Sequence, residues 1–130
     1  MADVTEDTNT NTDTGMLFTH GVQLFNEQEY FECHEVLEKL WNLQTGPDKQ
    51  FTQGLIQIAV GLYHLGRQNQ VGAHKLLTRG LARVEPFAPE YAELDVTTFV
   101  ACVTEVLNDL QAGLPHPAVG FPALVKSKKS

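Results

Sequence analysis

Serine is absent from the first 126 residues of this 130-residue chain, which contains only Ser127 and Ser130. A serine nucleophile within the folded core is therefore excluded. The two cysteines, Cys33 and Cys102, have no CxxC partner. Cys33 and the adjacent His34 point about 100° apart on a helix, so a cysteine–histidine dyad is not expected. Both thiols are predicted to be small buried groups in a reducing compartment.

Long apolar runs are also missing, and none approaches the ~20 residues of a membrane-spanning helix. The first residues, Met1-Ala2-Asp3-Val4, lack the basic region of a secretory signal. The net charge of −7 argues against a nucleic-acid partner. We therefore expect a cytoplasmic protein with no membrane or nucleic-acid partner. The sequence indicates no oligomeric state.

Charges of one sign are missing from two segments. Residues 49–84 contain five basic residues and no acidic one. Residues 27–38 contain no basic residue and five glutamates: Glu27, Glu29, Glu32, Glu35 and Glu38. The simpler interpretation is that the two segments compensate each other as neighbouring helices. A basic binding surface is the alternative.

No segment alternates apolar and polar residues as a strand does, whereas helical periodicity is almost continuous. It predicts helices over residues 17–28, 30–44, 49–67, 71–85 and 97–112, the second ending at Gly46-Pro47. The predicted fold class is all-α, a compact bundle of four to five helices built from two antiparallel helical hairpins. We expect a disordered acidic tail over residues 1–15, a helical bundle domain over 16–113 and a C-terminal tail over 114–130.

A weak internal repeat has a spacing of 40 residues. The aligned pairs are Gly21 with Gly61, Phe25 with Leu65, Cys33 with Ala73, His34 with His74, and Leu37 with Leu77. Each half then resembles a helical hairpin with a small residue at the helix crossing. Two units are fewer than the ~3 that a repeat array needs, so a duplicated hairpin is expected rather than an array.

Polar side chains interrupt the apolar faces of the second and third predicted helices. On a helical wheel of about 100° per residue, apolar residues flank His34 and Glu38 on both sides, and Glu35 lies at the boundary. A carboxylate buried there would need partners, which amides and histidines on the third helix would supply. We therefore predict a buried polar network of His34, Glu35, Glu38, Gln53, Gln57 and His64. The alternative is that the stripe on the third helix faces solvent.

His34-Glu35-Val36-Leu37-Glu38 is an HExxE motif, similar to the HExxH motif of zinc hydrolases. A metal-dependent hydrolase would use His34, Glu38 and His64 as ligands and Glu35 as general base. A mononuclear three-histidine site is a further alternative, because His20, His34, His64 and His74 fall on different predicted helices. A di-iron bundle is excluded, since residues 49–84 contain no carboxylate side chain.

Two runs together resemble the signature of domain-of-unknown-function family 309. They are Tyr30-Phe31-Glu32-Cys33-His34-Glu35-Val36-Leu37-Glu38 with Trp41, and Phe51-Thr52-Gln53-Gly54-Leu55-Ile56-Gln57-Ile58-Ala59 with Leu62-Tyr63-His64, Asn69 and Gly72-Ala73. The resemblance extends over residues 17–86. It implies a small all-helical bundle found in bacteria, archaea and plastid-bearing lineages, with no established activity. The motif residues that carry over are His34, Glu35, Glu38, Trp41, Gln53, Gly54, Gln57, His64, Asn69 and Gly72.

Two hypotheses follow for function. The first is a non-enzymatic binding or structural module without a cofactor, whose polar network sets the helix register. Its partner would be an unknown protein or a small polar ligand. The second is the metal-dependent hydrolase described above. We favour the first, because the ligand count is marginal for the second and the sequence contains no other catalytic pattern.

Overall fold

The computed structural model describes residues 2–114 and 120–128, with side chains from Asp13 onward. Its helices are α1 (Ala2–Asn26), α2 (Tyr30–Leu43), α3 (Gly46–Gly66), α4 (Gln70–Val84) and α5 (Val96–Gln111). A short 3-10 helix, η1 (Glu85–Phe87), and an antiparallel hairpin of β1 (Glu90–Tyr91) and β2 (Leu94–Asp95) connect α4 to α5. The predicted all-α class is confirmed. The expectation that the chain contains no strand is wrong, because β1 and β2, of two residues each, pair with one another.

The boundaries of α2 to α5 lie within three residues of those predicted. The largest difference is at Gly46-Pro47, which begins α3 instead of ending α2. Proline fits the first helical turn, where its missing N–H would have no partner. The helix α1 begins at Ala2, within the segment predicted as a tail. Side chains of residues 1–12 lie outside those described, so the division into tails and domain stays a prediction.

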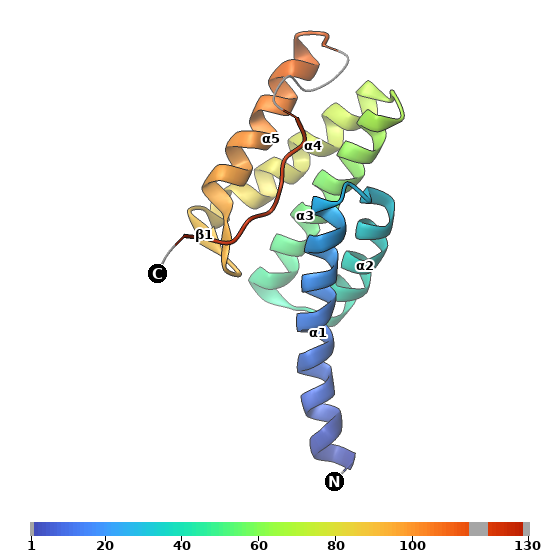
Figure 1. Cartoon of the computed structure of the whole chain (residues 1–130), viewed down its shortest axis with the longest axis vertical. Coiled ribbons are helices and arrows are strands. Elements are labelled where there is room, and N and C mark those ends of the chain that lie inside the picture. Colours follow the sequence, from blue (N-terminus) through green and yellow to red (C-terminus); the bar gives the residue numbers. More distant parts are fainter. Residues whose placement is uncertain (1, 115–119, 129–130) are drawn as a thin grey trace.

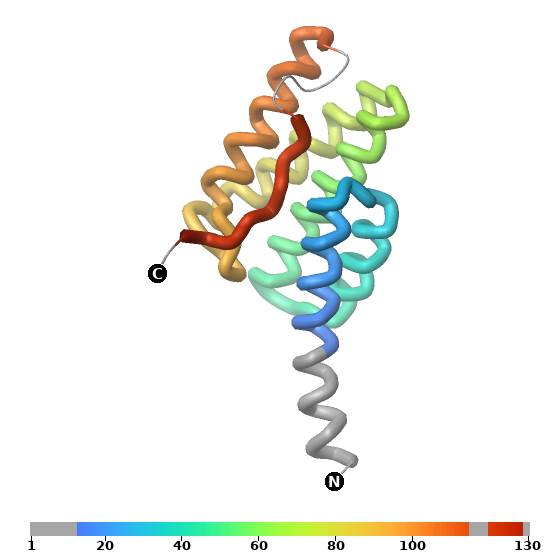
Figure 2. Tube along the Cα trace, viewed as in Figure 1, coloured from blue at the N-terminus to red at the C-terminus, as the bar shows by residue number. Residues whose placement is uncertain are grey.

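The helices form two antiparallel hairpins, α1 with α2 and α3 with α4, as predicted (Figure 1). The contact between α2 and α3 joins the hairpins, and α5 packs against α4. The C-terminal segment returns across the gap between α5 and α1 (Figure 2). Within the described residues, no helix combines the length and apolar character that crossing a membrane requires.

The two helices of each hairpin cross at a glycine. A Cβ added at Gly21 would lie 2.5 Å from Leu37 Cδ2, and one added at Gly61 would lie 2.8 Å from Leu77 Cγ. These glycine–leucine pairs are the ones that the 40-residue repeat aligns. A Cβ at Gly61 would also lie 3.1 Å from the Leu77 backbone nitrogen, so this crossing requires glycine, whereas a Cβ at Gly21 would meet only the side chain of Leu37.

The turns within the hairpins repeat in the same way. Gln28 and Gln68 both adopt the left-handed conformation, with φ of 64° and 63°. Cys33 and Ala73, a few residues into the second helix of each hairpin, are both 0% exposed. The 40-residue repeat is therefore a repeat of hairpin geometry.

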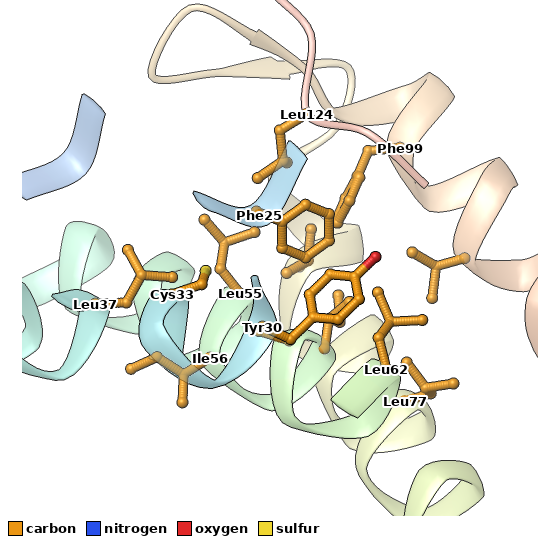
Figure 3. Packing of buried hydrophobic residues seen from close by; sticks show 14 of the residues in the cluster. Phe25, Tyr30, Cys33, Leu37, Leu55, Ile56, Leu62, Leu77, Phe99 and Leu124 are labelled. Carbon is orange, nitrogen blue, oxygen red and sulfur yellow. The ribbon is translucent and has the colours of Figure 1, made fainter. Parts of the chain in front are cut away.

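One continuous core receives side chains from all five helices (Figure 3). The ring of Phe25 lies edge-on to Tyr30 and to Phe99, with centroids 5.4 and 5.5 Å apart, and so links α1 to α2 and α5. Leu124 of the C-terminal segment lies beside Phe25 and Phe99 and is 4% exposed. A residue from the segment predicted as a tail thus belongs to the core.

Aromatic contacts hold the β1–β2 hairpin against the start of α3. The ring centroid of Tyr91 lies 4.9 Å from Phe51 and 4.6 Å from Phe87. The Tyr91 hydroxyl donates a hydrogen bond to the Asp48 carboxylate in the first turn of α3. The hairpin is therefore fixed relative to the helices.

Replacing Gly61 with alanine is expected to lower the free energy of unfolding by about 1–3 kcal/mol, because the helices would have to separate. The backbone nitrogen of Leu77 lies only 3.1 Å from the position of the new Cβ. Gly66→Ala is the matched control, since nothing lies within 4 Å of its Cβ position. That change should be neutral or stabilise by up to about 1 kcal/mol. Urea denaturation measures both, and equal effects would contradict a close crossing at Gly61.

Candidate functional site

The His34–Glu38 pair lies at the surface of α2 rather than in the core. His34 Nε2 lies 3.3 Å from Glu38 Oε2, and the two side chains are 24% and 56% exposed. His34 Nδ1 lies 3.2 Å from the carbonyl oxygen of Phe31, and Glu35 is exposed. The expectation that Glu38 is buried is therefore wrong. The reason is that the buried face of α2 is narrow and consists of Tyr30, Cys33, Leu37 and Leu40.

Gln53 and Gln57 of α3 are half-buried. Gln57 Oε1 accepts a hydrogen bond of 3.2 Å from Arg83 Nε, and Arg83 Nη1 donates one of 2.6 Å to Gln50 Oε1. Gln57 thus ties α3 to α4. Among the described residues, no hydrogen bond joins either glutamine to His34, and the predicted network is not assembled.

His64 near the end of α3, Asn69 in the turn and Gly72 in the first turn of α4 lie together. Asn69 Oδ1 accepts a 3.0 Å hydrogen bond from the Gly72 backbone N–H, which makes Asn69 the N-cap of α4. Asn69 Nδ2 lies 3.5 Å from His64 Nδ1. A Cβ on Gly72 would lie 2.7 Å from Asn69 Nδ2. These three motif residues therefore serve helix capping.

The proposed metal ligands are not brought together. Among the side chains that the structure describes, those of residues 13–114 and 120–128, no group of three His, Cys, Asp or Glu is placed to hold a metal ion. This removes the set of His34, Glu38 and His64 on which the hydrolase alternative depends. The three-histidine alternative is likewise not supported, because it also needs three grouped ligands. His74 instead contacts α5, where its Nε2 lies 3.1 Å from Gln111 Nε2.

The structure instead brings together aromatic rings on the outer side of α2 and α3. Phe31 is 51% exposed, and its ring centroid lies 5.5 Å from that of His34 and 5.6 Å from that of Tyr63. The Tyr63 centroid lies 6.2 Å from that of His64. These contacts form a line of rings across the α2–α3 contact.

Two basic side chains lie on aromatic rings along this contact. Lys49 Nζ lies 4.0 Å from the Trp41 ring centroid, and Arg67 Cζ lies 5.6 Å from that of Tyr63. Among the described residues, no ion pair links a base of segment 49–84 to a glutamate of segment 27–38. The predicted compensation between the two segments is therefore not made by ion pairs. Lys49 and Arg67 lie on rings, and Arg83 binds the amides of Gln50 and Gln57.

We define the α2–α3 seam as Phe31, His34, Glu35, Glu38 and Trp41 from α2, with Lys49, Tyr63 and Arg67 from α3 and its C-cap. The sequence predicts neither the exposure of Phe31 nor the presence of Lys49, Tyr63 and Arg67 in the seam. A signal for Phe31 is present on the wheel, where it falls within about 20° of Glu38. An aromatic residue beside an unpartnered carboxylate indicates a surface position.

The fold and the seam define a small all-α domain of two helical hairpins whose outer face carries aromatic and charged side chains. Residues 18–76 match the family described as Domain of unknown function (DUF309). The predicted resemblance is confirmed over these residues, which include the whole α2–α3 seam.

A relative in Bacillus subtilis (strain 168), named Uncharacterized protein YpuF, is 31% identical over 112 residues. The alignment covers 83% of this chain and 63% of the relative. The chain thus spans less than two thirds of that protein's length. Neither description assigns an activity.

Cys33 is fully buried, as predicted, whereas Cys102 is only half-buried. The Cys33 thiol donates a 3.3 Å hydrogen bond to the Gly21 carbonyl oxygen at the α1–α2 crossing. Burial raises the pKa of Cys33 to about 12. A thiol that keeps its proton at neutral pH is a poor nucleophile, so Cys33 has a structural role.

The Glu38→Ala substitution is expected to lower the free energy of unfolding by no more than about 1 kcal/mol, because exposed ion pairs contribute little. The adjacent Leu37 is 1% exposed, and Leu37→Ala should cost about 2–5 kcal/mol. Urea denaturation of both variants makes the comparison. A cost for Glu38→Ala as large as that for Leu37→Ala would restore the buried network.

Burial of Cys33 should make stability fall at alkaline pH. The unfolded thiol ionises near pH ~8.5, whereas the pKa of the folded thiol is about 12. Because the unfolded state then binds fewer protons, this contribution is complete below pH ~8.5 and declines by about 1.4 kcal/mol per pH unit up to pH ~12. Urea denaturation at several pH values above 8 should show a shallower decline for Cys33→Ala than for the unaltered chain. Parallel declines would contradict the shifted pKa.

Proposed function

We propose that this domain is a non-enzymatic binding module whose α2–α3 seam binds a cationic segment of a partner protein. The observation that carries the proposal is the Phe31 ring, which is 51% exposed and yet contacts both His34 and Tyr63. An exposed aromatic side chain held in place by its neighbours loses little conformational freedom on binding. Such side chains are enriched among the residues that dominate binding energy.

The charge around Phe31 indicates the chemistry of the partner. Glu35 and Glu38 follow Phe31 by one and two turns of α2, and both are exposed. Among the described residues, neither forms an ion pair with a lysine or arginine. Each of these carboxylates is therefore available to a cationic side chain of a partner, whereas Lys49 and Arg67 lie on rings of the seam.

The seam already binds cations that belong to this chain. Lys49 lies on Trp41, and Arg67 lies on Tyr63. A partner's arginine would lie on Phe31 in the same manner, with its guanidinium close to the Glu35 and Glu38 carboxylates. The seam combines the two kinds of group, ring and carboxylate, that favour arginine.

Several of the remaining motif residues have structural explanations. A Cβ on Gly54 would lie 2.5 Å from Val84 Cγ2, which places Gly54 at the close contact of α3 with α4. Gln57 binds Arg83 across the same contact, and Asn69 caps α4. None of these explanations applies to His34, Glu35 and Glu38, which lie on the seam. Binding is a role that suits their exposure.

The test uses Trp41, the only tryptophan of the chain, as a fluorescent reporter within the seam. Titration of the full chain with a short arginine-rich peptide that lacks tryptophan should change its fluorescence in a saturable manner. The affinity should fall as salt is added, because exposed charges are screened. A peptide with glutamine in place of each arginine should cause no saturable change.

Matched variants locate the binding surface. Phe31→Ala should weaken binding of the arginine-rich peptide by at least about tenfold, as expected for an aromatic anchor. Val71→Ala is its control, since Val71 is a large exposed apolar residue on α4. Glu38→Gln should weaken binding by about fivefold through a lost charge contact, whereas Glu105→Gln, an exposed position on α5, should not. Equal affinity for all four variants would overturn the proposed seam.

A further inference from the structure

The C-terminal segment, residues 120–128, packs along the bundle, and its Phe121 ring lies 6.1 Å from that of Tyr30 at the start of α2. It crosses the gap between α1 and α5 and reaches the β1–β2 hairpin (Figures 1 and 2). The segment lies outside residues 18–76, which match the family. It also lies apart from the α2–α3 seam, so its contacts need a separate explanation.

Asn26, the last residue of α1, binds the backbone of Leu124 through both ends of its side-chain amide. Asn26 Nδ2 donates to the Leu124 carbonyl oxygen at 2.9 Å, and the Leu124 N–H donates to Asn26 Oδ1 at 2.7 Å. One side chain thereby satisfies both backbone groups of one residue, as a neighbouring strand would. This contact recognises an extended backbone without regard to its sequence.

The hairpin continues the same main-chain recognition. The Asp95 N–H donates to the Val125 carbonyl oxygen at 2.9 Å, and the Ser127 N–H donates to the Glu93 carbonyl oxygen at 2.8 Å. Lys126 forms an antiparallel bridge with Leu94 of β2. The segment is thus added beside the hairpin as an extended peptide, the arrangement by which many domains bind peptides.

The side chains of the segment alternate between the bundle and solvent. Pro122 and Leu124 are buried, whereas Ala123 and Val125 are exposed. Leu124 reaches Phe25 and Phe99 in the core (Figure 3). The segment therefore behaves as an extended ligand, with main-chain hydrogen bonds along its length and apolar side chains pointing inward.

The segment leaves part of the site unfilled. A surface pocket of about 390 Å³, open to solvent on one side, lies beside Leu124, between α1 and the hairpin. Its lining includes Phe18, Val22 and Leu94 together with Leu124 and Lys126 of the segment itself. A side chain larger than leucine at the position of Leu124 would enter this space and bury more apolar surface.

We propose that α1, α5 and the β1–β2 hairpin form a groove for an extended peptide, which residues 121–127 occupy within the same chain. The ligand that the groove takes from another protein is an extended segment with a bulky aromatic side chain at the position of Leu124. The Asn26 amide and the hairpin bind its backbone, and the pocket beside Leu124 takes its aromatic ring. The chain's own C-terminal segment competes with that ligand and lowers its apparent affinity.

The test is a competition experiment with the full-length chain. The probe is a labelled synthetic peptide with the sequence of residues 120–128 carrying Leu124→Trp, followed by fluorescence polarisation. The Leu124→Asp chain should bind this probe at least about tenfold tighter than the unaltered chain, because its own segment no longer competes. Val125→Asp is the matched control, since Val125 is 47% exposed, and should bind as the unaltered chain does.

Two further variants test the groove itself. Adding Asn26→Ala to the Leu124→Asp chain should weaken probe binding by about tenfold, the loss expected for two backbone hydrogen bonds. A probe with Leu124→Asp in place of Leu124→Trp should not bind. A Leu124→Asp chain that keeps its helical circular dichroism and does not bind the Leu124→Trp probe would overturn the proposal.

Hydrogen exchange of the unaltered chain keeps the proposal testable if Leu124→Asp does not fold. A displaceable segment opens locally, so the Leu124 amide should exchange at least about 100-fold faster than the Leu62 amide in α3. Equal protection of the two amides would show that the segment leaves only when the whole domain unfolds, and would overturn the proposal. The unaltered chain could instead form a dimer that Leu124→Asp abolishes. The groove would then bind a second copy of the chain and not a segment of another protein, which also contradicts the proposal.

Discussion

The close crossing of helices at Gly21 and Gly61 is the constraint on which the rest of the structure depends. Each glycine lets the facing leucine, Leu37 or Leu77, approach to a distance at which a Cβ would clash. The Cys33 thiol then reaches the Gly21 carbonyl oxygen, which a wider crossing would leave without this partner. The two crossings fix how far α2 and α4 are rotated about their own axes. That rotation decides which side chains are buried.

The α2–α3 seam follows from this rotation. With Cys33 and Leu37 turned toward α1, the residues one step further round α2 lie at the edge of its contact with α3. Phe31 and His34 are therefore only partly covered, and Glu38 remains in solvent. The aromatic rings and carboxylates of the seam owe their exposure to the packing of α2 on α1. The exposed rings and carboxylates on one face of α2 are thus a consequence of the glycine crossing on its other face.

The helices were predictable from sequence because periodicity and breakers are local signals. The exposure of side chains around a helix was less predictable. The apolar neighbours of Glu38 on the helical wheel would bury it only if other helices covered both sides of this part of α2. One of those sides is open to solvent, and Glu38 is exposed. The hairpin of β1 and β2 is too short to show alternation. The backbone of Leu124 is hydrogen-bonded to Asn26, which is 98 residues away in sequence, and no local pattern connects two such positions.

The two surfaces depend on different parts of the chain, and this separates their roles. The α2–α3 seam lies wholly within residues 18–76, which match the family. The groove needs Asn26 from that region, but it also needs the hairpin, α5 and the segment that occupies it, all of which follow residue 76. A domain limited to the matched residues would keep every side chain of the seam and lose most of the groove. The seam is therefore the better explanation for a function shared by the family, whereas the groove is the better explanation for a function particular to this chain.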